Sequence, residues 1–251
     1  MKIVKRENYD QMSQYAAELI AAQVWMKPNC LLGLATGSTP LGIYQKLIEK
    51  HQAGLLDFSE VRSVNLDEYC GLAPDHDQSY HYYMNENFFR HINIAAENTH
   101  VPDGMAEDLA EEGRRYDAMI AKMGGIDLQL LGIGNTGHIG FNEPEETFPV
   151  ATHRVKLAQK TIDANSRFFA SVDDVPKYAI TMGMCSIMNA RRIILVANGE
   201  SKAEIVEKSF FGPVTPYVPA SILQLHPHVT VVLDREAASV IEKNHPEELK
   251  K

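Results

Sequence analysis

The chain has 251 residues, of which 45% are hydrophobic and 23% are charged, and these values are ordinary for a soluble globular protein. They exclude a disordered or fibrous chain, and the length is enough to bury a sizeable core in one large domain. The net charge of −9 argues against nucleic acid as a partner, because duplex binding requires a clustered basic face.

The sequence shows no sign of export or of membrane insertion. Residues 1–5 (MKIVK) lack the apolar core of a signal peptide, and no apolar run approaches the ~20 residues of a membrane span. Cys30, Cys70 and Cys185 are widely spaced, which fits reduced packing residues better than a disulfide framework or a zinc site. We therefore expect a cytoplasmic protein without a membrane partner.

The first predicted elements are a helix, a buried strand and a second helix. Apolar residues recur at helical spacing over residues 7–26, and residues 31–35 (LLGLA) form a continuous apolar run. A loop rich in glycine and hydroxyl groups, 36–42 (TGSTPLG), then leads into a helix over 43–51. This order is typical of a phosphate site, because the first N–H groups of a helix lack internal partners and attract anions.

Loop 36–42 also supplies side-chain donors. Ser38 and Thr39 add two hydroxyl groups beside the start of the helix. No Gly-Lys-Ser/Thr triplet follows, which excludes a nucleotide-binding P-loop. An ordinary helix cap with a turn glycine is the alternative interpretation of this stretch.

A further strand is predicted over residues 61–66, and Asp67 follows it directly. Ligands of parallel α/β sheets bind at the carboxyl ends of the strands, so Asp67 is placed for function. A helix cap or a solvated turn is the alternative for this carboxylate. Residues 79–91 are rich in aromatic side chains at helical spacing, and we expect a helix that packs into the core.

A helix over 106–122 and a strand over 126–131 lead into a glycine-rich stretch, 130–144 (LLGIGNTGHIGFNEP). It carries His138 and then Glu143, the pair needed for an imidazole that transfers protons in one fixed tautomer. Its glycines also match G-x-G-x-x-G. The residues that follow do not open a helix, however, so the match does not predict a dinucleotide site.

The chain departs from the alternating pattern after this loop. Residues 145–180 are polar and bounded by prolines, with a short strand over 152–157, and we interpret them as a lid inserted between elements of the sheet. Arg167 lies in this segment on a predicted short helix. A solvated surface charge is the alternative interpretation of Arg167.

The last part of the chain returns to the pattern. A strand over 192–196 leads through a turn that carries Lys202 into a helix ending near residue 211. The alternative interpretation of Lys202, as of Arg167, is a solvated surface charge. A short helix over 219–227 and a last strand over 229–233 complete the elements.

Alternating strands and helices of this kind predict an α/β fold with a doubly wound, mainly parallel sheet, a modified Rossmann-like arrangement. We found no repeat, linker or low-complexity run. The predicted organisation is one domain over 1–251 with a lid segment at about 145–180.

Six stretches of this sequence together resemble the glucosamine-6-phosphate deaminase family, also called glucosamine/galactosamine-6-phosphate isomerases. They span nearly the whole chain in order, and their combination is far more specific than any one of them. The stretches are 34–40 (LATGSTP), 65–69 (NLDEY), 137–144 (GHIGFNEP), 164–169 (ANSRFF), 175–179 (VPKYA) and 221–227 (SILQLHP).

The resemblance implies a role for each matching residue. Asp67 corresponds to the family's base, which moves a proton between C2 and C1 of the sugar, and His138 to the acid–base group that opens the pyranose ring. Glu143 corresponds to the carboxylate that orients this histidine. The family's phosphate contacts fall on Gly37, Ser38, Thr39, Arg167 and Lys202.

One position departs from the family pattern. Many members have aspartate or asparagine before the Gly-His pair, where this chain has Thr136, whose hydroxyl forms hydrogen bonds but carries no charge at neutral pH. Thr136 is therefore the expected third member of a modified relay with His138 and Glu143. The effector pocket and longer C-terminal segment of the regulated six-subunit members have no match here.

The implied reaction converts glucosamine 6-phosphate into fructose 6-phosphate and ammonia, in amino-sugar catabolism. It requires no metal or redox cofactor, only an acid–base group, a carboxylate base and a phosphate clamp. A small-molecule substrate and a monomer or homo-oligomer are expected. The alternatives are a 6-phosphogluconolactonase-like hydrolase and a non-catalytic sugar-phosphate sensor, although a sensor normally carries a DNA-binding helix-turn-helix, and the chain has neither the length nor the basic patch for one.

Overall fold

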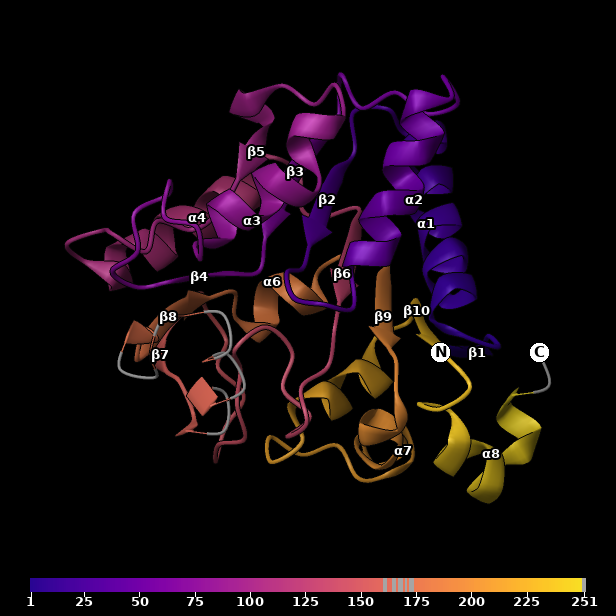
Figure 1. Ribbon diagram of the computed structural model, residues 1–251. Coiled ribbons are helices and arrows are strands. Elements are labelled where there is room, and N and C mark those ends of the chain that lie inside the picture. The colour runs from indigo at the N-terminus through magenta and orange to yellow at the C-terminus, as the bar shows by residue number, and fades with distance from the viewer. Residues whose placement is uncertain (160–161, 164–165, 167–168, 170, 172–173, 250–251) are drawn as a thin grey trace.

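A parallel sheet forms the centre of the molecule (Figure 1). The computed structural model describes residues 1–159, 162–163, 166, 169, 171 and 174–249. Within these residues, seven parallel strands form the central sheet. Their order across the sheet is β1 (Lys2–Lys5), β10 (Val229–Leu233), β9 (Ile193–Ala197), β6 (Leu128–Leu131), β2 (Leu31–Leu34), β3 (Arg62–Asn65) and β5 (Thr99–His100).

The central strands are apolar because both faces of the sheet are covered. Every residue of β2, β6 and β9 is buried. Continuous apolar strands of this kind are typical of parallel sheets with helices on both sides. Gly33 of β2 is required for another reason, since a Cβ there would lie 2.0 Å from the Oε1 atom of the buried Gln129 on β6.

Helices flank the central sheet on both sides (Figure 1). Asn8 and Asp108 cap the helices α1 and α4, respectively, by accepting hydrogen bonds from backbone N–H groups of the first turn. The α-helices are α1 (Tyr9–Met26), α2 (Leu41–Gln52), α3 (Tyr80–Asn87), α4 (Leu109–Lys122), α6 (Met184–Met188), α7 (Ala203–Phe211) and α8 (Ser239–Asn244). Short 3-10 helices are η1 (Phe89–His91), η2 (Ala96–Asn98), η5 (Glu200–Lys202), η6 (Pro219–Leu225) and η7 (Pro246–Leu249).

A second, antiparallel sheet begins where β3 ends. Its strands are β4 (Asp67–Tyr69), β8 (Tyr178–Thr181) and β7 (His153–Lys156), in this order. Asp67 is paired with Thr181. The sheet has a small core of its own, which consists of Tyr69, Phe141, Val155, Leu157 and Ala179.

The structure confirms the predicted fold class, an α/β fold with a doubly wound, mainly parallel sheet, and most of its elements. The predicted strands over 31–35, 61–66, 126–131, 192–196 and 229–233 correspond to β2, β3, β6, β9 and β10. Four strands were not predicted from the sequence, namely β1, β4, β5 and β8. No helix in the described part of the chain is both long and apolar enough to cross a membrane.

Some predicted boundaries were wrong. The helix expected over 79–91 ends at Asn87, because Phe88 leaves the helical conformation with φ −146° and ψ −62° while its ring packs against Tyr44 and Phe58. The helix expected from residue 106 begins only at Leu109, after its cap at Asp108. The predicted helix over 219–227 is the 3-10 helix η6.

Candidate active site

Asp67 is a buried carboxylate at the junction of the two sheets. Its side chain is 6% exposed, and β4 holds it directly after the end of β3 and Leu66. Burial and, to a smaller extent, the charge of the adjacent Glu68 together raise the pKa of the Asp67 carboxyl to about 8. A carboxyl group with a pKa near neutrality can both accept and return a proton, which suits a general base.

The glycine-rich loop passes next to Asp67. The backbone N–H of Phe141 donates a hydrogen bond of 3.0 Å to Oγ1 of Thr181, the residue that pairs with Asp67 in the small sheet. Gly140 has φ +58°, and a Cβ there would lie 2.8 Å from Thr181 Oγ1 and 3.5 Å from Asp67 Oδ2. A glycine is therefore needed for the loop to approach the carboxylate this closely.

Thr136, His138 and Glu143 form a closed group of hydrogen bonds on this loop. The Thr136 hydroxyl donates to Glu143 Oε2 at 2.7 Å. His138 Nδ1 lies 2.9 Å from Thr136 Oγ1 and 3.1 Å from Glu143 Oε1. Because the threonine hydrogen is used toward Glu143, both oxygens near Nδ1 act as acceptors, and the arrangement assigns the proton to Nδ1.

This tautomer leaves Nε2 of His138 able to accept or return a proton. Glu143 is 9% exposed, so its carboxylate acts on the imidazole with little competition from water. The Thr136 hydroxyl thus bridges the histidine and the glutamate, and its catalytic role in a relay stays a prediction.

A tight turn seats the His138 ring. The backbone N–H of Gly134 donates to the carbonyl oxygen of His138 at 2.9 Å, and that of Gly137 donates to the Gly134 carbonyl at 3.0 Å. A Cβ on Gly134 would lie 2.1 Å from both Cε1 and Nε2 of His138. The G-x-G-x-x-G spacing therefore makes room for a side chain of the protein itself.

Several hydroxyl groups hold the predicted phosphate loop in place. Gly37 has φ +100°, and its carbonyl accepts a 2.6 Å hydrogen bond from the Tyr83 phenol. The phenol of Tyr9 accepts from the Gly42 N–H at 2.8 Å and lies 2.9 Å from the Thr39 carbonyl oxygen. The Pro40 cap position of α2 has no side-chain hydrogen bond. Ser38 also lines an open cavity of about 640 Å³, together with Tyr9, Leu41, Gly42, Gln45, Asn87 and Asn198.

Lys202 lies between this loop and the glycine-rich loop. Its ammonium donates a hydrogen bond of 2.5 Å to Asn135 Oδ1, next to Thr136. Burial lowers the pKa of Lys202, since desolvation disfavours the charged form. On the other side, Thr39 Oγ1 donates to Oδ1 of Asn198 at 2.7 Å, and Asn198 precedes the 3-10 turn that carries Lys202.

The predicted site residues that the structure describes are thus connected. Gly140, on the loop of His138, lies close to Asp67. Asn135, next to Thr136, accepts a hydrogen bond from Lys202. Asn198, before the Lys202 turn, accepts one from Thr39 of the predicted phosphate loop. Arg167 lies outside the described residues. Among those that are described, no group of three or more His, Cys, Asp or Glu side chains could hold a metal ion.

Two aromatic residues of the predicted aromatic helix pack against the hydrophobic cores, as predicted, and their phenols also reach the candidate site. Tyr83 contacts the predicted phosphate loop, and the Tyr80 phenol lies near Asp67, Thr36 and Tyr69. The 3.6-residue spacing gave no signal for this, because Tyr80 and Tyr83 follow the same stripe as the buried Met84.

Comparisons with known proteins identify the family of this chain. Residues 5–232 match the family model described as glucosamine-6-phosphate isomerases/6-phosphogluconolactonase. The glucosamine-6-phosphate deaminase of Thermoanaerobacter pseudethanolicus is 57% identical over 241 residues, which cover 96% of this chain and 95% of the relative. That of Lachnoclostridium phytofermentans is 58% identical over 232 residues, covering 92% and 98%.

Solved structures of a glucosamine-6-phosphate deaminase and of 6-phosphogluconolactonases resemble this chain, at very different sequence identities. A monomeric glucosamine-6-phosphate deaminase superposes with a TM-score of 0.93 at 48% identity, over 96% of this chain and 100% of the other. The 6-phosphogluconolactonase from Trypanosoma brucei covers 95% and 97% with a TM-score of 0.77, but at 19% identity it shows the shared fold alone. The chain belongs to the glucosamine-6-phosphate isomerase/6-phosphogluconolactonase family.

Proposed function

We propose that this chain catalyses the isomerisation and deamination of glucosamine 6-phosphate to fructose 6-phosphate and ammonia, as part of amino-sugar catabolism. Relatives that are 57–58% identical over nearly the whole chain are glucosamine-6-phosphate deaminases, whereas the Trypanosoma brucei lactonase is only 19% identical. The observation that carries the proposal is the buried Asp67 beside a loop whose His138 is fixed by Glu143 and Thr136.

In the first step of the proposed reaction, His138 opens the pyranose ring. Its unprotonated Nε2 accepts the proton of the C1 hydroxyl and delivers it to the ring oxygen, while the bond between C1 and the ring oxygen breaks and the free aldehyde forms. Glu143 and Thr136 hold the Nδ1 proton, so that the ring nitrogen on the opposite side carries the transfer. The negative charge of Glu143 stabilises the imidazolium that this role requires.

Asp67 then acts as the base for the carbon acid. Its carboxylate removes the proton from C2 while the aldehyde oxygen takes up a proton, which gives the enolamine. Asp67 then returns its proton to C1, and the amino group gives up one N–H proton as the imine forms at C2. Water adds to the imine, and the carbinolamine releases ammonia and leaves the ketone. The raised pKa of Asp67 makes the carboxylate a stronger base than an exposed aspartate.

The phosphate group binds at the loop that precedes α2. Gly37, Ser38 and Thr39 offer backbone and hydroxyl donors there, and Lys202 offers a charge from the adjacent turn. Arg167 is proposed as a second cationic ligand on the strength of the family motif alone. The segment over 145–180 is proposed to cover the bound sugar as a lid.

The proposed setting is the cytoplasm, with a small-molecule substrate and no membrane or nucleic-acid partner. A monomer is favoured because the 48% identical solved relative is described as monomeric. Size-exclusion chromatography with light scattering should then give a mass near 28.0 kDa.

Ammonia release tests the activity directly. Purified protein without added metal or cofactor should release ammonia and fructose 6-phosphate in equal amounts from glucosamine 6-phosphate. Galactosamine 6-phosphate in a parallel reaction defines the preference at C4. Hydrolysis of 6-phosphogluconolactone without ammonia release from either amino sugar would overturn the proposal in favour of the lactonase alternative.

A further inference from the structure

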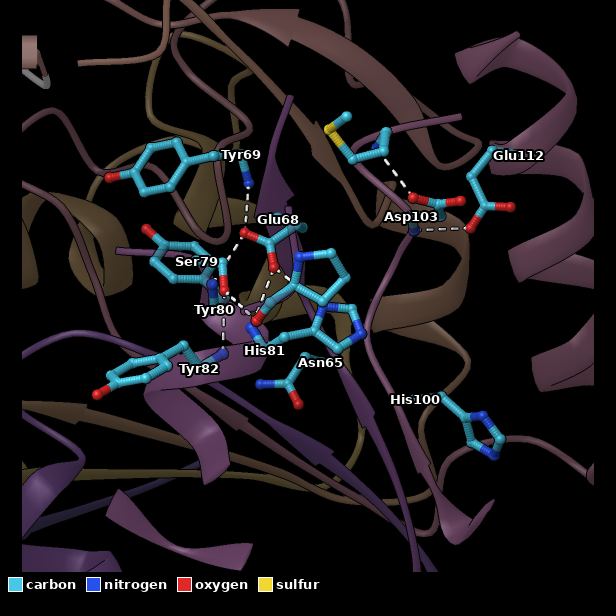
Figure 2. Close-up of polar contacts among 12 residues, drawn as sticks. Asn65, Glu68, Tyr69, Ser79, Tyr80, His81, Tyr82, His100, Asp103 and Glu112 are labelled. Atoms are coloured by element: carbon cyan, nitrogen blue, oxygen red, sulfur yellow. Dashed lines mark hydrogen bonds and ion pairs between the residues drawn. The ribbon is translucent and has the colours of Figure 1, made fainter. Parts of the chain in front are cut away.

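Glu68 is a second buried carboxylate, directly after Asp67, and the proposed reaction steps do not use it. Its side chain is 1% exposed. Oε1 accepts hydrogen bonds from the backbone N–H groups of Tyr69 at 2.8 Å and Tyr80 at 2.9 Å, and Oε2 accepts from that of His81 at 3.0 Å (Figure 2). His81 Nδ1 lies 3.1 Å from the same Oε2. Such a fully satisfied buried carboxylate holds its surroundings in one geometry.

The groups bound by Glu68 belong to the first turn of α3. Ser79 is the cap residue, and its hydroxyl accepts from the Tyr82 N–H at 3.0 Å. Glu68 accepts hydrogen bonds from the two N–H groups between the cap and Tyr82, those of Tyr80 and His81, which have no partner inside the helix. The positive end of the helix dipole favours the carboxylate there. Glu68 therefore fastens α3 to β4 at the residue next to Asp67.

The first residue of α3 faces the opposite way, toward the sugar site. The Tyr80 ring is parallel to that of Phe141, with 12° between the planes and 6.2 Å between centroids, and it lies 4.8 Å from the Tyr69 ring. The phenol lies near Thr36, the residue before Gly37. One residue thus connects the surroundings of Asp67 with the start of the phosphate loop, while its backbone is held by Glu68.

We propose that Glu68 is a positioning residue for proton transfer at Asp67: it locks the first turn of α3 onto β4 and so fixes Asp67 and the Tyr80 phenol relative to each other at the sugar site. Successive side chains of a strand point to opposite faces, so Glu68 does this from behind the site without contacting the substrate. The inference rests on the proposed role of Asp67 as the base.

The charge of Glu68 also acts on Asp67. It raises the pKa of Asp67 in addition to desolvation. The other titratable groups near this pair are His81, which faces Glu68, and the phenols of Tyr80 on α3 and Tyr116 on α4, which sense the charge of Asp67. Burial raises the pKa of both phenols well above the ordinary value, so neither phenol is ionised at neutral pH.

The test replaces Glu68 by glutamine and measures the pH dependence of kcat/KM between about pH 5.5 and 9.5. This range brackets the pKa of Asp67. Glu68→Gln should move the acidic limb to lower pH by roughly 1 unit. It should also lower kcat at the pH plateau. The glutamine side chain has only one oxygen, so its NH2 group must face a backbone N–H of α3 that the carboxylate accepted, and the first turn of α3 shifts. The matched control is Glu112→Gln, since Glu112 is likewise buried and accepts a backbone N–H, that of Asp103 at 2.9 Å (Figure 2).

An unchanged limb in Glu112→Gln together with a shifted limb in Glu68→Gln supports the inference. A limb that stays in place in both variants, with loss of thermal stability alone, would reduce Glu68 to a structural cap. His81→Gln provides a second variant if Glu68→Gln does not fold, because it leaves the three backbone contacts of Glu68 intact. It should alter the limb without loss of folding, and an unaltered limb would count against the inference.

A readout without catalysis separates this inference from the proposed function. The free energy of unfolding of wild type minus that of Asp67→Asn reports the titration of Asp67 in the folded protein. The same difference measured in the Glu68→Gln background should stop changing at a lower pH than in wild type, by the same interval as the limb moves, because the folded-state pKa of Asp67 sets that point. If ammonia release fails but this shift is found, the function is wrong and the electrostatic coupling stands. If ammonia release succeeds and the shift is absent, the coupling is wrong.

Discussion

Asp67→Asn should remove most of the turnover and at the same time stabilise the fold. Loss of a general base lowers the rate by about a hundredfold to ten-thousandfold. The stabilisation follows from the pKa of Asp67, which rises from 3.8 to about 8 on folding. Between these two values the folded state holds a proton that the unfolded state has lost, so the contribution of Asp67 to stability is fully present below pH 4 and is lost as the pH rises through 8.

The size of the effect follows from the same values. Each unit of pKa difference corresponds to about 1.4 kcal/mol, so at pH 7 the buried carboxyl costs on the order of 4 kcal/mol relative to pH 4, as an upper limit. Because asparagine has no proton to lose, Asp67→Asn should gain stability over wild type by amounts that increase from pH 5 to pH 8.

Urea denaturation at pH 5, 6, 7 and 8 measures this difference. A matched control is Asp108→Asn, which replaces the exposed cap of α4, whose pKa is lowered by the Ala110 and Glu111 N–H groups. The Asp108 variant should show a constant difference over this range. A constant difference for Asp67→Asn as well would mean that Asp67 is ionised throughout and would refute the reasoning.

Three other sets of variants test the rest of the site. Thr136→Val should slow turnover of the cyclic substrate, Thr136→Asp should change it only modestly, and Glu143→Gln should slow it more than either; a valine variant as fast as wild type would remove position 136 from catalysis. Gly134→Ala should displace the His138 ring and lower kcat, whereas Gly132→Ala, where a Cβ meets nothing within 4 Å, should keep it; equal rates would show that the ring has room to move. Lys202→Ala and Arg167→Ala should weaken glucosamine 6-phosphate far more than glucosamine, measured as kcat/KM, and an equal effect on both sugars would make these residues structural.

The parts of the site that could be predicted from the sequence are those built from contiguous residues. The loop at 36–42 follows a buried strand and precedes a helix, and the relay Thr136, His138 and Glu143 lies within one short loop. In such segments the residue order itself brings the groups together. The fold class was predicted for the same reason, since the strands of a parallel sheet are continuous apolar runs.

The parts that could not be predicted depend on contacts between distant segments. The pairing of β4 with β8 places Thr181 opposite Asp67, and nothing in the polar residues after position 144 indicated that register. Glu68 was visible only as a neighbour of Asp67, because its partners come from the start of α3. The role of Asp234, which accepts hydrogen bonds from Gly199 N–H at 3.0 and 3.1 Å and so holds the Lys202 turn, likewise appears only in the folded chain.

The most direct test of Asp67 as the base uses glucosamine 6-phosphate that carries deuterium at C2. Because Asp67 is 6% exposed, a deuteron taken from C2 exchanges slowly with water, and part of it should appear at C1 of the fructose 6-phosphate formed by wild type. Asp67→Asn should form neither labelled product nor ammonia at a comparable rate. Transfer of the label at the wild-type rate by Asp67→Asn would contradict the account, because another group would then move the proton.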